Sequence, residues 1–256
     1  MTTWTFAGTA LTDFGKITIL DDYLDLPAKR GNNQTIPFRD GTIFTQKYFE
    51  ERTVLMGIAI NTTSATTLES TFDSMRKLFG RRTEATLTAT MEDSTTRSAL
   101  ASVNKPLQVG RKSANVALAV IEFDMCTPYF RSGTVIADNT TTINAGTVAM
   151  NVINTGTAQE RDPIITMVGP LNNPVITNST NGYSLTYAGT IAGTLVIQTT
   201  SGEYVAANGT ANVIGNLTHS GGACMMAFEP GTNVMSIVNS VGTTGTVKAS
   251  FYAPYF

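Results

Sequence analysis

Histidine and cysteine are scarce in this sequence of 256 residues, which contains one His and two Cys. The lone imidazole, His219, excludes an HExxH zinc site and any other site that needs two histidines. Cys126 and Cys224 lie far apart along the chain, so no CxxC metal or redox spacing exists. We therefore expect no metal and no cofactor, and we interpret both cysteines as reduced, buried, small hydrophobic residues.

Charged residues are also sparse, at 14% of the sequence, and the formal net charge is -2. A protein that binds nucleic acid by neutralising phosphates carries a basic field, which this balance does not favour. No apolar run approaches the roughly 20 residues that span a bilayer, and the first residues lack the features of a signal peptide. The sequence therefore predicts no membrane insertion.

Motifs of common enzymes are missing as well: the sequence has no GxxxxGK[ST] loop, no GxSxG elbow and no GxGxxG turn. His219 lies in a polar, turn-like stretch, which is typical of a surface histidine. We expect no catalytic residues and interpret the protein as not an enzyme. A small hydrolase that pairs His219 with a carboxylate stays as the least favoured alternative.

The charges that are present divide the chain into two parts. Residues 1–131 hold 15 of the 17 Lys and Arg and 14 of the 19 Asp and Glu, so residues 132–256 are almost uncharged. Near residue 131 an apolar, strand-like run meets Pro128 and then a small polar segment. We predict an N-terminal domain over 1–131 and a C-terminal domain over 132–256.

The N-terminal half contains β-branched runs and one convincing helix. Strands are predicted at 16–20, 53–60, 84–91 and 115–124, the last buried on both faces. The helix is predicted near 66–79, with a capping box that starts at Thr66 and Gly80 as the C-cap. Its apolar face comprises Leu68, Phe72, Met75, Leu78 and Phe79.

The C-terminal half is rich in short apolar runs separated by turn signals such as Asn181-Gly182 and Asn208-Gly209. Many short strands at this spacing are typical of an antiparallel β-sandwich. The predicted fold class is therefore mainly β, with a β-sandwich-like N-terminal domain that contains one amphipathic helix and a second β-sandwich after it.

The order of several motifs resembles a known family. A polar arm, Lys-Arg-Gly to Ile-Pro-Phe-Arg-Asp-Gly, covers Lys29–Gly41 and precedes a Glu-Arg-Thr-Val-Leu strand. The helix then ends in Phe-Gly, a later strand closes in Cys-Thr-Pro-Tyr-Phe, and a Thr-rich sandwich follows. This order resembles the distal tail proteins, also called the tail hub or siphovirus-type tail component, of bacteriophages with long non-contractile tails.

The resemblance implies a structural virion protein without cofactors, made in the bacterial host cytoplasm and placed at the distal end of the tail. Six copies would form a ring that joins the tail tube protein to the tail tip or baseplate complex, with a galectin-like C-terminal sandwich. The N-terminal arm would reach a neighbouring subunit. The arm residues implied in this contact are Lys29, Arg30, Ile36, Phe38, Arg39, Ile43 and Phe44.

A ring through which DNA passes must not bind it, because neutralised phosphates would trap the duplex by counterion release. We therefore hypothesise a neutral or acidic lumen, with Asp21, Asp22 and Asp25 as candidate lumen-facing acids. Arginines lining the bore would contradict this hypothesis. Whether the ring closes through the arm, through pairing of sheet edges or through both stays open.

The main alternative is a carbohydrate-binding module that recognises a host saccharide. Sugar sites present aromatic ring faces, and Tyr183, Tyr187 and Tyr204 are the candidates in the second half. This alternative predicts a glycan affinity that is lost on Tyr183→Ala or Tyr187→Ala. Among tail proteins a tube subunit is the nearest alternative, but the second domain argues against it.

Overall fold

The computed structural model describes residues 2–20, 25–45, 47–144, 146–200, 203–221, 224–240 and 244–256. It divides into two compact units, one that runs to Gly133 and includes Phe256, and one over Thr134–Tyr255. Antiparallel strands dominate both units, and α1 (Ala65–Phe79) is the one α-helix in the described residues. The prediction of a mainly β protein with one amphipathic helix is confirmed.

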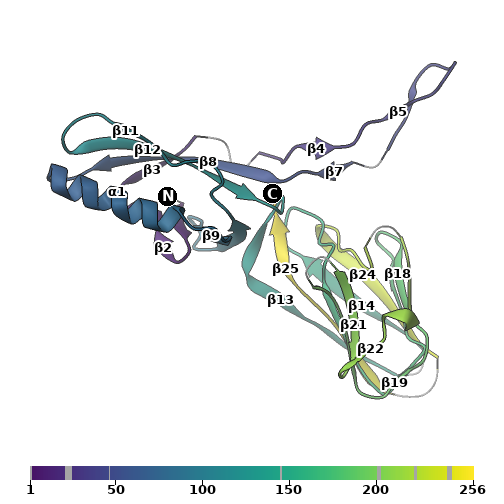
Figure 1. Ribbon diagram of the computed structural model, residues 1–256. Helices are drawn as coiled ribbons and strands as arrows, with labels where there is room; N and C mark the ends of the chain where they lie inside the picture. The colour runs from purple at the N-terminus through teal and green to yellow at the C-terminus, as the bar shows by residue number, and fades with distance from the viewer. Residues whose placement is uncertain are drawn as a thin grey trace. The chain divides into compact units, whose positions relative to one another are not determined.

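The first unit contains two antiparallel sheets around one core. One sheet has the order β2-β1-β9-β10-β13 and the other β11-β12-β8-β3. Figure 1 shows the long strands β8 and β12 side by side. The bounds are β1 Thr3–Phe6, β2 Thr9–Ala10, β3 Lys16–Ile19, β8 Arg52–Asn61, β9 Ala85–Thr90, β10 Thr96–Ala101, β11 Gln108–Arg111, β12 Val116–Met125 and β13 Phe130–Ile143, with a short 3-10 helix η1 at Leu11–Asp13.

Helix α1 buries the face that its sequence predicts, because Leu68, Phe72, Met75 and Phe79 all join the core of the first unit. The predicted cap at Thr66 is wrong. Ser64 is the N-cap, and its hydroxyl accepts a hydrogen bond from the backbone N–H of Thr67 at 3.1 Å. The helix therefore begins two residues earlier than its capping box suggested.

Strand β12 corrects a second expectation, since it is not buried on both faces. Ala117, Ala119 and Ile121 point into the core, whereas Leu118 between them is exposed. One side of the sheet packs on the core that contains the helix, and the other side is only partly covered. Buried and more exposed residues therefore alternate along the strand, as expected for a sheet with one buried face.

Four short strands form an arm within the first unit, between β3 and β8. They pair as two separate ladders, β4 with β7 and β5 with β6. Their bounds are β4 Lys29–Arg30, β5 Gln34–Thr35, β6 Thr42–Ile43 and β7 Tyr48–Phe49.

The second unit is also built from two antiparallel sheets. One has the order β13-β25-β15-β20-β21-β22 and the other β14-β24-β17-β18-β23, and a two-stranded ladder pairs β16 with β19. The bounds are β14 Gly146–Asn154, β15 Ile164–Val168, β16 Leu171–Asn172, β17 Val175–Asn178, β18 Tyr183–Tyr187, β19 Thr190–Ile191, β20 Thr194–Thr200, β21 Glu203–Asn208, β22 Ala211–Asn212, β23 Leu217–Ser220, β24 Gly231–Asn239 and β25 Gly245–Tyr255, with a 3-10 helix η2 at Ile214–Asn216.

Buried asparagines connect the strands and loops of the second unit. The Asn178 amide donates to the backbone oxygen of Ala227 at 2.8 Å and to Oδ1 of Asn233 at 3.1 Å. Asn154 donates in the same way to the backbone oxygens of Ala158 and Phe228. These amides are almost fully buried, so they pair loop carbonyls that would otherwise lose their hydrogen bonds to water.

Candidate assembly surface

The arm is held together by few internal contacts. The β4–β7 ladder pairs Lys29 with Phe49, and the β5–β6 ladder pairs Gln34 with Ile43. Between the two ladders the Thr45 hydroxyl donates to the backbone oxygen of Asn32 at 2.8 Å. Because an isolated two-stranded ribbon is at best marginally stable in water, these ladders alone give the arm little stability.

The tip of the arm presents apolar side chains to solvent. Phe38 is fully exposed, and its backbone has a φ of +59°, in the left-handed region that bulky residues rarely adopt. Phe44 is 75% exposed, and Ile43 is exposed beside it. Such a group of exposed apolar side chains is typical of interaction sites.

The base of the arm is fixed to the first unit by aromatic contacts. The Phe49 ring packs against Phe256 with a centroid distance of 4.5 Å, and Tyr129 contacts Phe256 at 6.0 Å. Lys29 places its Nζ 5.1 Å from the Phe49 ring centroid, a cation–π contact. The arm is therefore anchored at one end and exposed at the other.

Arg52, which the sequence did not single out, fixes the strand that follows the arm. Its side chain is buried, donates to the backbone oxygen of Asp25 at 2.9 Å and lies over the Phe130 ring at 5.8 Å. The signal was present, because Arg52 is in phase with Val54 and Met56, which point into the core. Two further exposed residues that the sequence did not single out are Tyr48 in β7 of the arm and Leu26 just before the arm.

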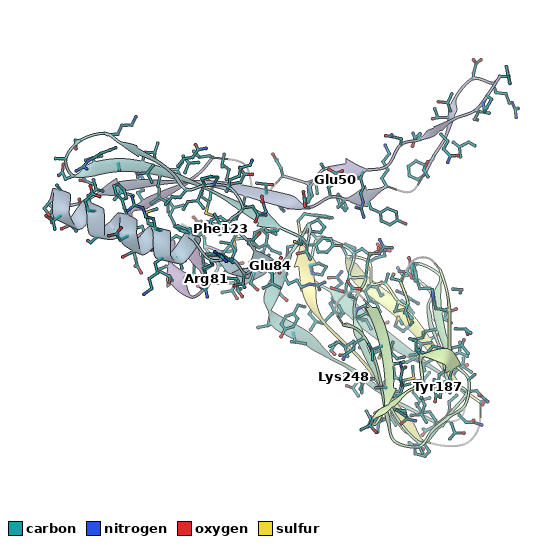
Figure 2. All side chains as sticks on the ribbon, viewed as in Figure 1. Glu50, Arg81, Glu84, Phe123, Tyr187 and Lys248 are labelled. Carbon is teal, nitrogen blue, oxygen red and sulfur yellow. The ribbon has the colours of Figure 1, made fainter. Side chains whose placement is uncertain are left out.

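A polar groove of about 420 Å³ lies beside the arm base, lined by Arg30, Phe49, Glu50, Glu51 and Cys126. Figure 2 labels Glu50 where the arm joins β8. The expectation that both cysteines are buried is wrong for Cys126, which is exposed and donates to Glu84 Oε1 at 3.2 Å. This hydrogen bond to the carboxylate raises the pKa of the Cys126 thiol above its ordinary value. Cys224 is buried as expected.

The predicted arm residues lie together in sequence and in the two ladders or the tip between them. Lys29 and Arg30 form β4, Ile43 lies in β6, and the other arm residues lie in the tip or directly after β6. All are exposed except Ile36, which is half-buried. Of the candidate lumen acids, Asp25 is exposed, whereas Asp21 and Asp22 lie outside the described residues.

The tyrosines considered for sugar stacking lie in the core of the second unit. Tyr183 is 7% exposed and Tyr187 is 3% exposed, and both point inward from β18, on which Figure 2 labels Tyr187. A buried ring offers no face to a saccharide, so neither residue forms a stacking platform. The side chain of Tyr204 lies outside what the structure describes.

His219 is exposed, as expected of a surface histidine, but it lies in strand β23 and not in a turn. It pairs with Leu185 of β18. Among the described residues no group of three or more His, Cys, Asp or Glu side chains could hold a metal ion. Within the same residues, no helix combines the length and the apolar character needed to cross a membrane.

Known proteins resemble this chain mainly in fold. Residues 11–125 match the family model for the phage tail protein RIFT-related domain. A comparison with curated protein sequences gave no match. The crystal structure of the Dit (gp 19.1) protein of phage SPP1, described as a paradigm of the hub adsorption apparatus in phages that infect Gram-positive bacteria, matches with a TM-score of 0.64 at 15% identity. This match covers 98% of this chain and 99% of the SPP1 chain.

Two further matches are chains from the phage p2 baseplate in its activated conformation, one with Ca and one with Sr. Their TM-scores are both 0.45, at 10% and 9% identity, and they cover 97% and 100% of this chain and 98% and 100% of the matched chains. The similarity to the SPP1 protein extends over both units. Both findings agree with the resemblance to distal tail proteins: residues 11–125 match the model of the phage tail RIFT-related domain, and the whole chain has a fold similar to that of the SPP1 Dit protein.

Proposed function

We propose that this protein forms a hexameric ring, the hub at the distal end of a phage tail, which joins the tail tube protein to the tail tip or baseplate complex. The fold of a phage tail structural protein supports this role. In this proposal the protein acts by assembly and catalyses no reaction.

One observation carries the proposal: the arm exposes Phe38, Ile43 and Phe44 on a ribbon held by two short ladders. In an isolated chain these apolar side chains remain in water. The unfavourable backbone conformation of Phe38 is then not offset by any packing of its side chain. Packing of the tip on another surface would remove the apolar side chains from water and offset the backbone strain at Phe38. The arm is therefore an interaction element that needs a partner.

A second copy of the same chain fits the arm as its partner. The arm carries Lys29, Arg30, Arg39 and Lys47 against one acid, Asp40, while the whole chain has a net charge of -2. The rest of the chain is therefore acidic on balance and attracts the basic arm of a neighbour. A contact between an arm and a different surface of the next copy is heterologous, and such contacts close a ring when the rotation between neighbouring copies divides a full turn.

DNA would pass through this ring without being bound. Asp25 is the described member of the candidate lumen acids, and a neutral or acidic bore releases a duplex that a basic bore would retain. An assembled ring that places Arg30, Arg39 or Arg81 in the bore would contradict this part of the proposal.

The arm can be tested with the double variant Phe38→Ser/Phe44→Ser. We expect the purified variant to stay monomeric under conditions in which the natural protein forms a ring, as measured by native mass spectrometry. Leu100→Ser, which changes an exposed apolar residue of β10 outside the arm, is the matched control and should assemble normally. Normal ring formation by the double variant would overturn the role of the arm.

The carbohydrate-binding alternative is not proposed, since Tyr183 and Tyr187 are buried. A glycan array probed with the full-length protein provides the check. Binding that survives Tyr187→Ser, with the fold intact, would place a saccharide site elsewhere in the second unit.

A further inference from the structure

Strand β14, Gly146–Asn154, forms one edge of the five-stranded sheet in the second unit. It is longer than the other edges of the larger sheets, of which β2 and β22 are uncharged but have only two residues each. The edge strands β3, β11 and β23 have four residues each and contain Lys16, Arg111 and His219, respectively. β14 has nine residues and contains no charged residue and no proline.

The hydrogen bonds of β24 show which backbone groups of β14 point outward. Val234 of β24 uses its N–H and C=O on the β17 side, because its nitrogen donates to Thr180 Oγ1 at 3.0 Å and its oxygen accepts from the Ser179 nitrogen at 2.8 Å. The next residue, Met235, therefore points its backbone groups toward β14, where its partner is Met150. By alternation, the residues on either side of Met150 point their N–H and C=O groups away from the sheet.

The residues whose backbone groups form this free edge are Thr147, Ala149, Asn151 and Ile153. Among the described residues, no backbone or side chain hydrogen-bonds to these groups. Natural proteins protect long edges with lysine, proline, bulges or a covering segment, because an exposed edge is a template for another strand. β14 contains no charged residue and no proline that would hinder pairing, so its edge is suited to pairing with another strand.

We propose that β14 pairs with β14 of a second copy of this chain, antiparallel, about a two-fold axis at Met150. In this register Thr147 lies opposite Ile153 of the other copy, and Ala149 lies opposite Asn151. Every residue of the strand then has a partner, from Gly146 to Asn154. The result is one continuous sheet across two copies.

The absence of charge favours a second copy as the partner. In antiparallel self-pairing, identical residues lie close to the axis, so a charged strand repels its own copy. β14 avoids this repulsion, and its outward side chains, Thr147, Ala149, Asn151 and Ile153, are small, β-branched or neutral. The neighbouring outward residues of β24, among them Val234 and Ser236, are also uncharged.

This inference does not depend on the proposed ring. A two-fold contact joins copies in pairs through the second unit, whereas the arm belongs to the first unit. If the ring forms, β14 pairing doubles its mass by joining two rings, and if it does not form, pairing converts a monomer into a dimer. In both cases the signature is a factor of two in mass.

The test is sedimentation velocity of the full-length protein over a range of concentrations. We expect Asn151→Lys to raise the dissociation constant of the pair by about tenfold or more, because it places two lysines at diagonal positions across the axis. Ala149→Pro should act in the same direction, since it removes an outward N–H without removing a β14–β24 hydrogen bond. Ser236→Lys, on the same face but on the neighbouring inner strand, is the matched control and should leave pairing unchanged.

A charge pair provides the check on register. In the double variant Ala149→Glu/Asn151→Lys, each lysine lies opposite a glutamate of the other copy, so pairing should recover relative to Asn151→Lys alone. The proposal is overturned if the natural protein shows no two-fold increase in mass up to concentrations of about 100 μM. It is equally overturned if Asn151→Lys and Ser236→Lys weaken pairing to the same extent.

Discussion

The guanidinium of Arg52 donates a hydrogen bond to the backbone oxygen of Asp25 at a distance of 2.9 Å, which joins the two ends of the arm. Asp25 precedes the arm and Arg52 begins the strand that follows it. Arg52 also lies over the ring of Phe130, which in turn contacts Trp4 with a centroid distance of 6.0 Å. The position of the arm is therefore coupled to the core of the first unit.

Arg52→Met should destabilise the first unit by about 1–3 kcal/mol, because the substitution removes the hydrogen bond to the Asp25 backbone oxygen and the contact with the Phe130 ring. Trp4 is the single tryptophan of the chain and is buried beside Phe130, so its fluorescence follows unfolding of this unit in urea. Arg76→Met is the control, since Arg76 forms an exposed ion pair with Asp73 that contributes little. Equal losses in the two variants would contradict the anchoring role.

The position of the helix cap can be tested by two single substitutions. Ser64→Ala should destabilise the first unit by about 1 kcal/mol, because it removes the acceptor for the Thr67 N–H. Thr66→Ala should have a much smaller effect, since Thr66 lies inside the helix and is exposed. Trp4 fluorescence in urea measures both. A larger loss from Thr66→Ala would restore the cap that the sequence suggested.

The asparagine network of the second unit predicts a contrast between two similar sequences. Asn178 and Asn216 both stand in Asn-x-Ser/Thr triplets, but Asn178 is buried and hydrogen-bonded whereas Asn216 is exposed. Asn178→Ala should lower the free energy of unfolding by about 2–3 kcal/mol, because it removes two buried hydrogen bonds, to the Ala227 oxygen and to Asn233 Oδ1, and the acceptor of the Thr180 N–H. Asn216→Ala should change the free energy of unfolding by no more than about 0.5 kcal/mol. Scanning calorimetry of the full chain provides the comparison.

The thiol of Cys126 should react slowly with iodoacetamide near pH 8. The Glu84 carboxylate accepts its hydrogen bond and raises the pKa of the thiol, so less of the reactive thiolate is present at that pH than for an ordinary cysteine. Glu84→Ala should lower this pKa and move the pH dependence of alkylation to lower pH. Glu69→Ala, an exposed acid of α1 that pairs with Arg111, should leave the profile unchanged. An unchanged profile in Glu84→Ala would contradict the assigned cause.

Strongly periodic segments could be predicted from the sequence. Examples are the apolar face of α1 and the β-branched runs of β8, β9 and β12. Because one face of each element is buried, its apolar residues recur with the period of a helix or of a strand. Strand β1 was missed although Trp4 and Phe6 alternate with threonines, which is a period-two signal in a very short run. β11 is exposed along its whole length, so only its pairing with β12 defines it as a strand.

Some features of the candidate site could likewise be predicted from the sequence and others could not. The arm could be predicted because glycine, proline and charge interrupt the hydrophobic pattern between β3 and β8. The phase of β8 indicates that Arg52 is buried, but the partners of Arg52 and of Asn178 could not be predicted, because the sequence does not show which groups a buried polar side chain will bond. Those partners come from segments distant in sequence, such as Asp25 and Ala227.

The most direct test of the proposed function is the mass of the purified natural protein by native mass spectrometry at low and high salt, with negative-stain images of the same sample. We predict closed rings of six copies with a central hole in the images. When β14 pairs two rings, the mass should be that of twelve copies. The ring should persist at high salt, since apolar arm residues contribute to the contact and salt does not screen them. A protein that remains monomeric, or at most dimeric, at all concentrations and salt conditions would contradict the ring.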